Sequence, residues 1–264
     1  MKHNDHLLPP VTRILARRPA PNFAQGESTR RHLGQPDAQR LMEQYDEYLD
    51  ALRALGLDVR VLPADPAHPD AHFVEDPVVI FRGMAFYSRS GAYSREDEAA
   101  DLAPHLADLE AVHIQGDEAR LDGGDVLFTT DRVLIGLSAR TNRAGAEQLA
   151  HALQSVQADL RVDFVPLTGV LHLKTGLTEL APGVLLRDSH LKTDFDFTFA
   201  ACINLPPQEG YAANALPING QLLMAAGYPH AAEIASAYYT RIRLLDMTEF
   251  EKMDGSLTCL SLRY

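Results

Sequence analysis

Short blocks of alternating apolar and polar residues recur five times along the chain. Each of the first four blocks predicts a strand, a short turn and a second strand, and the last predicts a single strand. The blocks begin 40 to 52 residues apart, a spacing typical of a repeated structural unit. The pattern therefore predicts an α/β fold whose units are arranged radially around a central channel. The blocks cover 73–87, 122–137, 174–186, 214–224 and 257–264.

Apolar positions at helical spacing predict four helices, one before the first block and three between blocks. Asp37 and Asn142 stand at the expected starts of the first and third helices, where their side chains would act as N-caps. Gly56 follows the first helix and marks its end. The expected helices cover 36–55, 96–111, 142–157 and 229–242.

The remaining segments predict two further strands and a loop. Residues 11–19 and 59–62 favour strands, whereas the polar segment 21–35 has no regular period, and we interpret it as a mobile lid over a site. No stretch is typical of an interdomain linker, so we expect a single domain over 1–264. A doubly wound parallel sheet is the competing fold. It ranks lower because strand pairs joined by short turns outnumber strand–helix–strand alternations.

The chain is acidic, with 24 Lys and Arg against 36 Asp and Glu and a formal net charge of −12. This balance argues against nucleic acid or an anionic membrane as a partner, because both favour basic patches. It suits a small cationic substrate. The sequence shows no secretory disulfide framework, no signal-peptide core and no apolar run near the roughly 18 residues of a membrane helix. We therefore expect a cytoplasmic protein with reduced thiols.

Three carboxylates precede the apolar run at 78–81, namely Asp70, Glu75 and Asp76. Such residues are commonly solvated, but Glu75 and Asp76 also fit the planar fork of a guanidinium. His and Cys at zinc-binding spacing are absent, so we expect no metal. Asp122 begins a second acidic cluster, which includes two glycines and fits a solvated turn and a site equally well. Phosphate-binding glycine motifs and a serine-hydrolase elbow are absent from the sequence.

His172 and Cys259 are the candidate acid–base and nucleophilic groups. Alone, each fits a buried structural side chain, since leucines flank His172 and Cys259 lies near the start of a predicted strand. Polar residues follow His172, however, and disfavour a core position. A His and a Cys brought together form an activated nucleophile, and a carboxylate behind the His would orient it. Arg95 and Arg140 lie beside loops or helix starts, where a pair would suit a substrate carboxylate.

Together these stretches resemble the dimethylarginine dimethylaminohydrolase family of guanidine-modifying enzymes, the penteins. The resemblance implies a five-module α/β propeller with a central substrate channel. It also implies hydrolysis of dimethylarginine or monomethylarginine to citrulline and an amine, through a covalent thiouronium on cysteine and without a cofactor. An arginine deiminase or hydroxyarginine hydrolase is the nearest alternative, and a silent binding protein for a cationic amino acid is another. The similar stretches are 70–76, 121–125, 138–142, 171–176, 211–214 and 254–259.

The resemblance also implies roles for single residues. Cys259 corresponds to the nucleophile, His172 to the general acid and base, and Asp122 to the carboxylate that orients the histidine. Eight residues are implied to bind the substrate: Glu75 and Asp76 at the guanidinium, Asp70 at the amino end, Arg95 and Arg140 at the carboxylate, Met253 through its backbone carbonyl, Asp254 next to it, and Glu27 in the lid. No metal is implied, and we expect a monomer or a homodimer.

Overall fold

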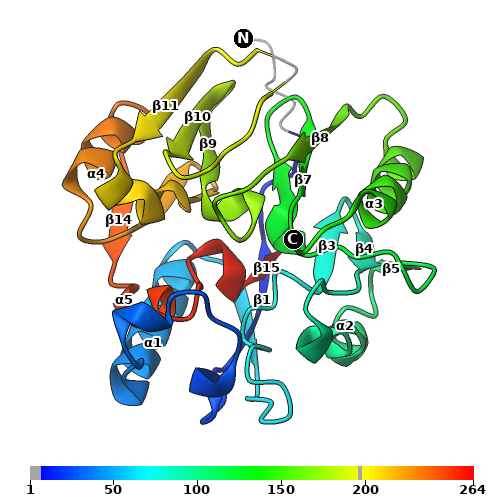
Figure 1. Ribbon diagram of the computed structural model, residues 1–264, viewed down its shortest axis with the longest axis horizontal. Helices are drawn as coiled ribbons and strands as arrows, with labels where there is room; N and C mark the ends of the chain where they lie inside the picture. Colours follow the sequence, from blue (N-terminus) through cyan, green and yellow to red (C-terminus); the bar gives the residue numbers. More distant parts are fainter. Residues whose placement is uncertain (1–6, 196–197) are drawn as a thin grey trace.

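Five three-stranded β-sheets surround the centre of the molecule in the computed structural model, which describes residues 7–195 and 198–264 (Figure 1). All five sheets repeat one plan, in which the first and second strands pair antiparallel and the second and third pair parallel. The predicted five-module α/β propeller is thereby confirmed. The sheets, in ring order, are β15 (Leu262–Arg263), β1 (Arg13–Arg17) and β2 (Asp58–Leu62); β3 (Val78–Phe81), β4 (Met84–Tyr87) and β5 (Glu110–His113); β6 (Val126–Phe128), β7 (Val133–Leu137) and β8 (Val162–Pro166); β9 (Leu177–Ala181), β10 (Val184–Asp188) and β11 (Ala201–Leu205); β12 (Leu216–Ile218), β13 (Gln221–Ala225) and β14 (Ile242–Leu245).

The longer helices lie on the outside of this ring (Figure 1). The predicted caps are present on two of them: Asp37 accepts a hydrogen bond from the Arg40 N–H at 2.8 Å, and Asn142 accepts one from the Gly145 N–H at 3.0 Å. Each cap satisfies a backbone donor that the first helical turn leaves free. The helices in the described residues are α1 (Ala38–Ala54), α2 (Glu98–Leu102), α3 (Arg143–Val156), α4 (Pro229–Ser236) and α5 (Thr248–Glu251).

Two of the predicted helices are too long, because each prediction extended into a strand. The segment expected to be helical over 96–111 contains α2, a 3-10 turn at Ala103–His105 and the start of β5. Pro104 lies in that turn and has no N–H with which to continue an α-helix. Likewise, α4 ends at Ser236, and Ile242 begins β14. These third strands pair parallel with the middle strand of their sheets.

The outer helices bury apolar stripes against the sheets and hold the inner ends of the strands in place. Leu41 and Tyr45 of α1 are fully buried in one cluster with Phe250 of α5, and Leu149 and Leu153 of α3 are fully buried in another. Burial of each such side chain contributes about 2 kcal/mol to stability. The packed outer layer therefore provides a rigid frame for the loops at the centre.

The loops that precede the first strand of each sheet, here called the inner loops, meet at the centre of the ring. They comprise 70–77, 121–125, 171–176, 211–215 and 254–261. Each inner loop hydrogen-bonds to the next, so the five modules are joined in a closed circle. The successive contacts are the Glu75 N–H to the Cys259 carbonyl (3.3 Å), the Gly123 N–H to the Asp76 carbonyl (2.8 Å), the Leu173 N–H to the Asp125 carboxylate (2.9 Å), and the Asn214 amide to the Lys174 carbonyl (2.8 Å) and the Thr258 hydroxyl (2.9 Å).

The last inner loop differs from the prediction. Cys259 lies in a 3-10 turn, Thr258–Leu260, rather than in a strand. Five residues before Cys259, Asp254 adopts a positive φ of 57°. Gly255 is required for a different reason, since a Cβ there would lie 2.3 Å from the Phe73 ring. The side chain of Phe73 thus packs directly on the backbone of the loop that carries the cysteine.

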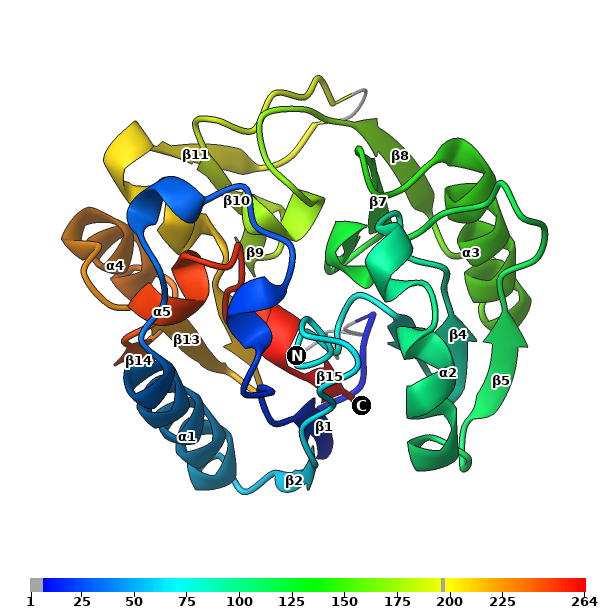
Figure 2. The same cartoon turned by 60° about the horizontal axis from the view of Figure 1, so that its bottom comes forward.

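The predicted lid is irregular, as expected. It contains two 3-10 turns, Phe23–Gln25 and Arg31–Leu33, and its movement remains a prediction. Figure 2 shows this blue segment lying against the red C-terminal segment near the centre of the ring. Among the described residues, no helix combines the length and apolar character needed to cross a bilayer.

Candidate active site

One cavity of about 90 Å³ at the centre of the ring collects most of the predicted site residues. His172 and Cys259 line the same cavity, although they come from the inner loops of two different modules. Asp122 and Glu75 lie behind its wall, and four lining residues were not singled out from the sequence. The lining consists of Glu27, Ser28, Thr29, Asp70, Phe73, Asp76, Arg95, Arg140, Leu171, His172, Met253, Asp254 and Cys259.

Asp122 holds the imidazole of His172 from behind. Its Oδ2 lies 3.0 Å from His172 Nε2, and its Oδ1 accepts a hydrogen bond from the Gly91 N–H at 3.0 Å. Burial opposes ionisation of Asp122, but the hydrogen bond and positive charge of His172 outweigh it and lower the pKa of the carboxyl. The carboxylate therefore fixes the orientation of the ring and favours its protonated form.

The other face of His172 is enclosed by acidic groups and by a glycine. His172 Nδ1 lies 3.9 Å from Asp76 Oδ1. Burial lowers the pKa of His172, but the charge of Asp76, the hydrogen bond to Asp122 and the charge of Asp125 raise it to about 9. The imidazole is consequently protonated at neutral pH. A Cβ on Gly124 would lie only 2.6 Å from Nδ1, which explains a glycine at this point of the acidic cluster.

Cys259 is a thiol rather than a thiolate in the free protein. Burial, followed by the negative charges of Glu75 and Asp76, raises the pKa of Cys259 to about 12. Its backbone is fixed by the Cys259 N–H, which donates to the Ser256 carbonyl at 3.2 Å, and by the Cys259 carbonyl described above. The site therefore holds a neutral nucleophile beside negatively charged carboxylates. A bound cation would offset this negative charge.

Asp76 is the carboxylate of the predicted guanidinium pair that faces the cavity. Its Oδ1 accepts the Gly124 N–H at 3.1 Å, and its Oδ2 accepts from Arg95 Nη1 at 2.7 Å. Arg95 is itself buried and also donates to Glu98 at 2.7 Å and to the Phe73 carbonyl at 3.0 Å. Arg95 thus fixes Asp76, and most of its donors are already used.

Glu75 points away from the lining. Its Oε1 accepts from Lys174 Nζ at 2.6 Å and pairs with Arg263 as well. Burial raises the pKa of Glu75, but the charges of Lys174 and Arg263 prevail and lower it. Sequence reasoning could not reveal these two partly buried cations, which partly neutralise the acidic wall behind Cys259.

Arg140 remains available for a ligand. Its half-buried side chain lines the cavity, and among the described residues its guanidinium has no hydrogen-bond or ion-pair partner. Asp70 is similarly poised: its Oδ1 is buried without a partner, and burial raises its pKa. These two groups lie in the wall of one cavity and could receive the two ends of an amino acid.

Several side-chain contacts hold the lid over the cavity, and three of them involve Asp70, Glu27 and Asp254. Asp70 Oδ2 accepts the Glu27 N–H at 2.8 Å, and Glu27 Oε1 accepts from the Ser94 hydroxyl at 2.9 Å. Asp254 accepts both the N–H and the hydroxyl of Thr29, at 2.5 and 2.9 Å. Asp254 and Glu27, both predicted to bind substrate, therefore fasten the lid as well as line the cavity.

Two groups of described residues have the ligand types and the spacing for a metal ion. One is Asp76, Asp122 and His172, the same buried set that supports the acid–base assignment. The other is Asp65, His68 and Asp101, in which His68 Nδ1 lies 2.8 Å from Asp65 Oδ2. The first group already uses its nitrogen and carboxylate oxygens in the contacts given above.

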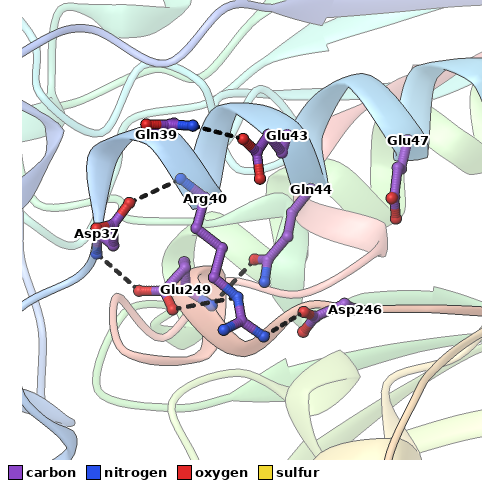
Figure 3. A pocket seen from close by; sticks show the side chains of 8 residues that line it. All are labelled: Asp37, Gln39, Arg40, Glu43, Gln44, Glu47, Asp246 and Glu249. Carbon is purple, nitrogen blue, oxygen red and sulfur yellow. Dashed lines mark hydrogen bonds and ion pairs between the residues drawn. The ribbon is translucent and has the colours of Figure 1, made fainter.

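A larger pocket of about 580 Å³ lies beside α1, away from the predicted residues (Figure 3). Arg40 crosses it and pairs with Asp246 at 2.7 Å, and Glu249 accepts the Asp37 N–H at 2.8 Å. Glu43 accepts a hydrogen bond from Gln39 at 2.9 Å, and the lining contains neither a nucleophile nor a histidine. The chemistry of the molecule therefore belongs to the smaller, central cavity.

A five-module propeller with a cysteine, a histidine and carboxylates at its centre is the architecture of guanidine-modifying enzymes, and comparison with known proteins agrees. Residues 101–182 match the family model described as Arginine deiminase. The chain is 36% identical to the N(G),N(G)-dimethylarginine dimethylaminohydrolase of Pseudomonas aeruginosa, covering 95% of this chain and 98% of the relative. It is 39% identical to the protein of the same name from Streptomyces coelicolor, with 96% and 97% covered. The chain belongs to the dimethylarginine dimethylaminohydrolase family.

Solved structures support the same conclusion. A cysteine-to-serine mutant of the Pseudomonas aeruginosa protein, complexed with citrulline, superposes with a TM-score of 0.89 at 34% identity, covering 97% of this chain and all of the other. The N-terminal domain of ArgZ, a cyanobacterial arginine dihydrolase, superposes with a TM-score of 0.81, covering 95% and 97%. At 19% identity, this second likeness shows a shared fold alone.

Proposed function

We propose that this protein hydrolyses dimethylarginine or monomethylarginine to citrulline and dimethylamine or methylamine. The main observation is that Cys259, His172 and the carboxylate of Asp76 line one cavity, and that Asp122 holds His172 in place. The names of the relatives, and citrulline in the complex of one of them, support the same reaction. Linear-amidine hydrolysis of this kind requires a nucleophile, an acid–base group and a site for a planar cation, and the cavity supplies all three.

Substrate binding uses the charges around the cavity. Asp76 takes the guanidinium, because a carboxylate matches its flat array of N–H donors. Arg140 takes the substrate carboxylate, with Arg95 beside it, and Asp70 takes the amino group. Glu27 and Asp254 keep the lid closed, and Met253, which lines the same cavity, meets the substrate through its backbone carbonyl.

The cationic substrate activates the nucleophile. Its positive charge lowers the pKa of Cys259 from about 12, so that the thiol releases its proton to solvent. The thiolate sulfur attacks the guanidino carbon, and the bond to the methylated nitrogen breaks as protonated His172 gives its proton to the departing amine. This leaves a covalent thiouronium on Cys259 and a neutral imidazole.

The second half of the reaction reverses the proton transfer. Neutral His172 takes a proton from water, whose oxygen attacks the same carbon. The carbon–sulfur bond then breaks as the hydroxyl proton of the tetrahedral intermediate passes to the leaving sulfur, so citrulline leaves and Cys259 returns to the thiol. The carboxylate of Asp122 stabilises the imidazolium in both halves. Each step uses side chains of this chain alone.

A turnover assay tests the proposal. The protein is incubated with dimethylarginine, monomethylarginine, hydroxyarginine and arginine, and citrulline is measured. We expect the methylated substrates to be preferred and Cys259→Ser to abolish turnover. A preference for arginine would favour the deiminase alternative, and hydroxyarginine the related hydrolase. Binding without citrulline formation would favour the silent binding protein.

We also infer that the protein acts in the cytoplasm as a monomer or homodimer. Both Cys202 and Cys259 are free thiols, which suits a reducing compartment. Light scattering after size-exclusion chromatography measures the oligomeric state. A mass corresponding to three or more chains would contradict this inference.

A further inference from the structure

Four of the five modules supply a proposed functional side chain from their inner loops, namely Asp76, Asp122, His172 and Cys259. The fifth module places Asn214 at the equivalent point, shortly before β12. We propose that Asn214 is a positioning residue that sets the Cys259 sulfur relative to the His172 imidazole. This inference rests on the proposed function and extends it by one residue.

The Asn214 amide bonds to the segments that carry both reacting groups. Its side-chain Nδ2 donates to the Lys174 carbonyl at 2.8 Å and to the Thr258 hydroxyl at 2.9 Å. Its Oδ1 accepts the Thr258 N–H at 3.3 Å. Lys174 lies two residues after His172, and Thr258 immediately precedes Cys259. One side chain therefore connects the histidine turn to the cysteine turn.

The chemistry of this junction requires an amide. The two turns present one carbonyl, one hydroxyl and one N–H to a position that is only 2% exposed. A primary amide offers two donors and an acceptor on one planar group, whereas a carboxylate has no donor and a hydroxyl has one. Loss of the amide would leave buried polar groups unpaired in both turns.

The backbone of Asn214 is itself held on both sides. The Thr178 hydroxyl, on β9, donates to the Ala213 carbonyl at 2.8 Å and accepts the Ala215 N–H at 3.2 Å. The Tyr211 hydroxyl donates to the Gly255 carbonyl at 2.8 Å and ties the same inner loop to the loop of Cys259. The amide is thus presented from a fixed support rather than from a mobile loop.

The position of the fifth module explains why such a link is needed. In the ring, the β12–β14 module stands between the β9–β11 module, whose inner loop contains His172, and the β15–β1–β2 module, whose inner loop contains Cys259. The spacing of sulfur and imidazole therefore depends on what connects the turns through the intervening module. A misplacement of about 1 Å between reacting groups can reduce a rate by on the order of 100-fold.

The test compares Asn214→Ala with Gln44→Ala. Gln44 is a matched control because its amide is 3% exposed and also joins two elements, bonding Thr248 and the Glu249 N–H at 2.9 and 3.0 Å, outside the central cavity. We expect Asn214→Ala to lower kcat by roughly 10- to 100-fold with less than about a threefold change in KM. Gln44→Ala should lower the melting temperature and leave kcat within about twofold of wild type.

A second readout separates positioning from general destabilisation. The rate of Cys259 alkylation by iodoacetamide is measured against pH in a Cys202→Ser background, which removes the exposed thiol of β11. We expect the apparent pKa of the alkylation profile to move in Asn214→Ala and to stay unchanged in Gln44→Ala. If Asn214→Ala does not fold, Thr258→Val, which removes the hydroxyl partner, is compared with Thr258→Ser, which keeps it. Loss of kcat in the valine variant alone supports the proposal.

The outcomes distinguish this inference from the proposed function. Folded Asn214→Ala with kcat within about twofold of wild type and an unchanged alkylation profile would overturn the positioning role, as would equal activity of the two Thr258 variants. In either case, citrulline production that depends on Cys259 would stand. Failure of the wild-type protein to form citrulline would instead refute the proposed function.

Discussion

At the scale of single residues, the site works by balancing buried charges around His172. Asp76, Asp122 and Asp125 surround the imidazole, and together they raise its pKa to about 9 against the effect of burial. Burial, together with the charges of Glu75 and Asp76, keeps Cys259 neutral until a cation arrives, so Asp76 contributes to both effects. Acid and nucleophile are thus both set by one environment, and each awaits the substrate in its protonated form.

This balance predicts how stability depends on pH. The folded pKa of His172, about 9, lies above the ordinary value of 6.5, so protonation stabilises the native state. That contribution is complete below about pH 6.5 and is lost as the pH rises through 9. We expect it to amount to on the order of 1–3 kcal/mol.

Urea unfolding of wild type and His172→Asn at pH 6, 7.5 and 9 measures this effect. The variant cannot gain a proton, and it shares the other titrating groups, so the difference between the two curves isolates the imidazole. The wild type should lose stability relative to His172→Asn between pH 6 and 9. Parallel behaviour of the two proteins would show that the imidazole is not preferentially protonated in the native state.

The sequence could not predict which charged side chains pair with one another at the site. The spacing of Glu75 and Asp76 predicts a pair of carboxylates for one guanidinium. In the structure, however, the carboxylate of Glu75 forms ion pairs with Lys174 and Arg263. Arg95 fits a carboxylate-binding arginine, yet Glu98 and Asp76 take most of its donors. Glu98 lies three residues after Arg95, but the other partners are distant in sequence from the groups with which they pair. The sequence therefore predicts the types of charge at the site but not their pairing.

At the scale of elements, predictions succeeded where local chemistry decides the structure. Side-chain caps begin α1 and α3, and the antiparallel strand pairs follow from alternation and short turns. The third strand of the first sheet, β2, was predicted, but the other four third strands were missed; β5 is mostly exposed, and only the last residue of β14 is buried. Each of these strands forms by pairing parallel with the middle strand of its sheet, which is distant in sequence. The local pattern of apolar and polar residues does not reveal such a contact.

The lid is the element whose role is open to a direct measurement. Asp254 fastens it through Thr29 and lies 3.5 Å from Arg30 Nε. Asp254→Asn keeps a residue that tolerates the positive φ but removes the charge and one acceptor. We expect KM to rise roughly 3- to 10-fold, since each lost hydrogen bond to a charged group costs about 1.5–3 kcal/mol of closure, only part of which reaches the substrate.

Steady-state kinetics and limited proteolysis within 22–34 test the fastening of the lid. Cleavage should accelerate in Asp254→Asn and slow again when substrate is added. Asp246→Asn, which alters the ion pair with Arg40 beside α1, is the matched control and should leave both measurements unchanged. Unaltered KM and cleavage in Asp254→Asn would show that this carboxylate does not control closure.

At the scale of the whole molecule, the last strand closes the ring. β15 completes the sheet begun by β1, and Ile14 and Leu15 pair with Arg263 and Leu262. The sequence predicted the repeat from its spacing, but it could not show that the ends of the repeat share one sheet. Arg263 connects this closing strand to the centre of the ring. Its side chain contacts Glu75, the Thr258 carbonyl at 2.8 Å and the Ser261 carbonyl.

Removal of Arg263 should therefore weaken the fold as a whole. Arg263→Gln leaves Glu75 buried with Lys174 as its remaining cation, and breaking one arm of a buried ionic group costs about 3–5 kcal/mol. Glu75→Gln in the same chain removes the unbalanced charge, so the double variant should recover part of the lost unfolding free energy. Urea unfolding of the two single variants and the double variant gives the coupling free energy between Glu75 and Arg263.

Arg13→Gln, which breaks an exposed pair with Asp108, is the control and should lower the unfolding free energy only slightly. If the losses of the two central variants simply add, the charges of Glu75 and Arg263 act independently, and closure of the ring depends on strand pairing rather than on this ion pair.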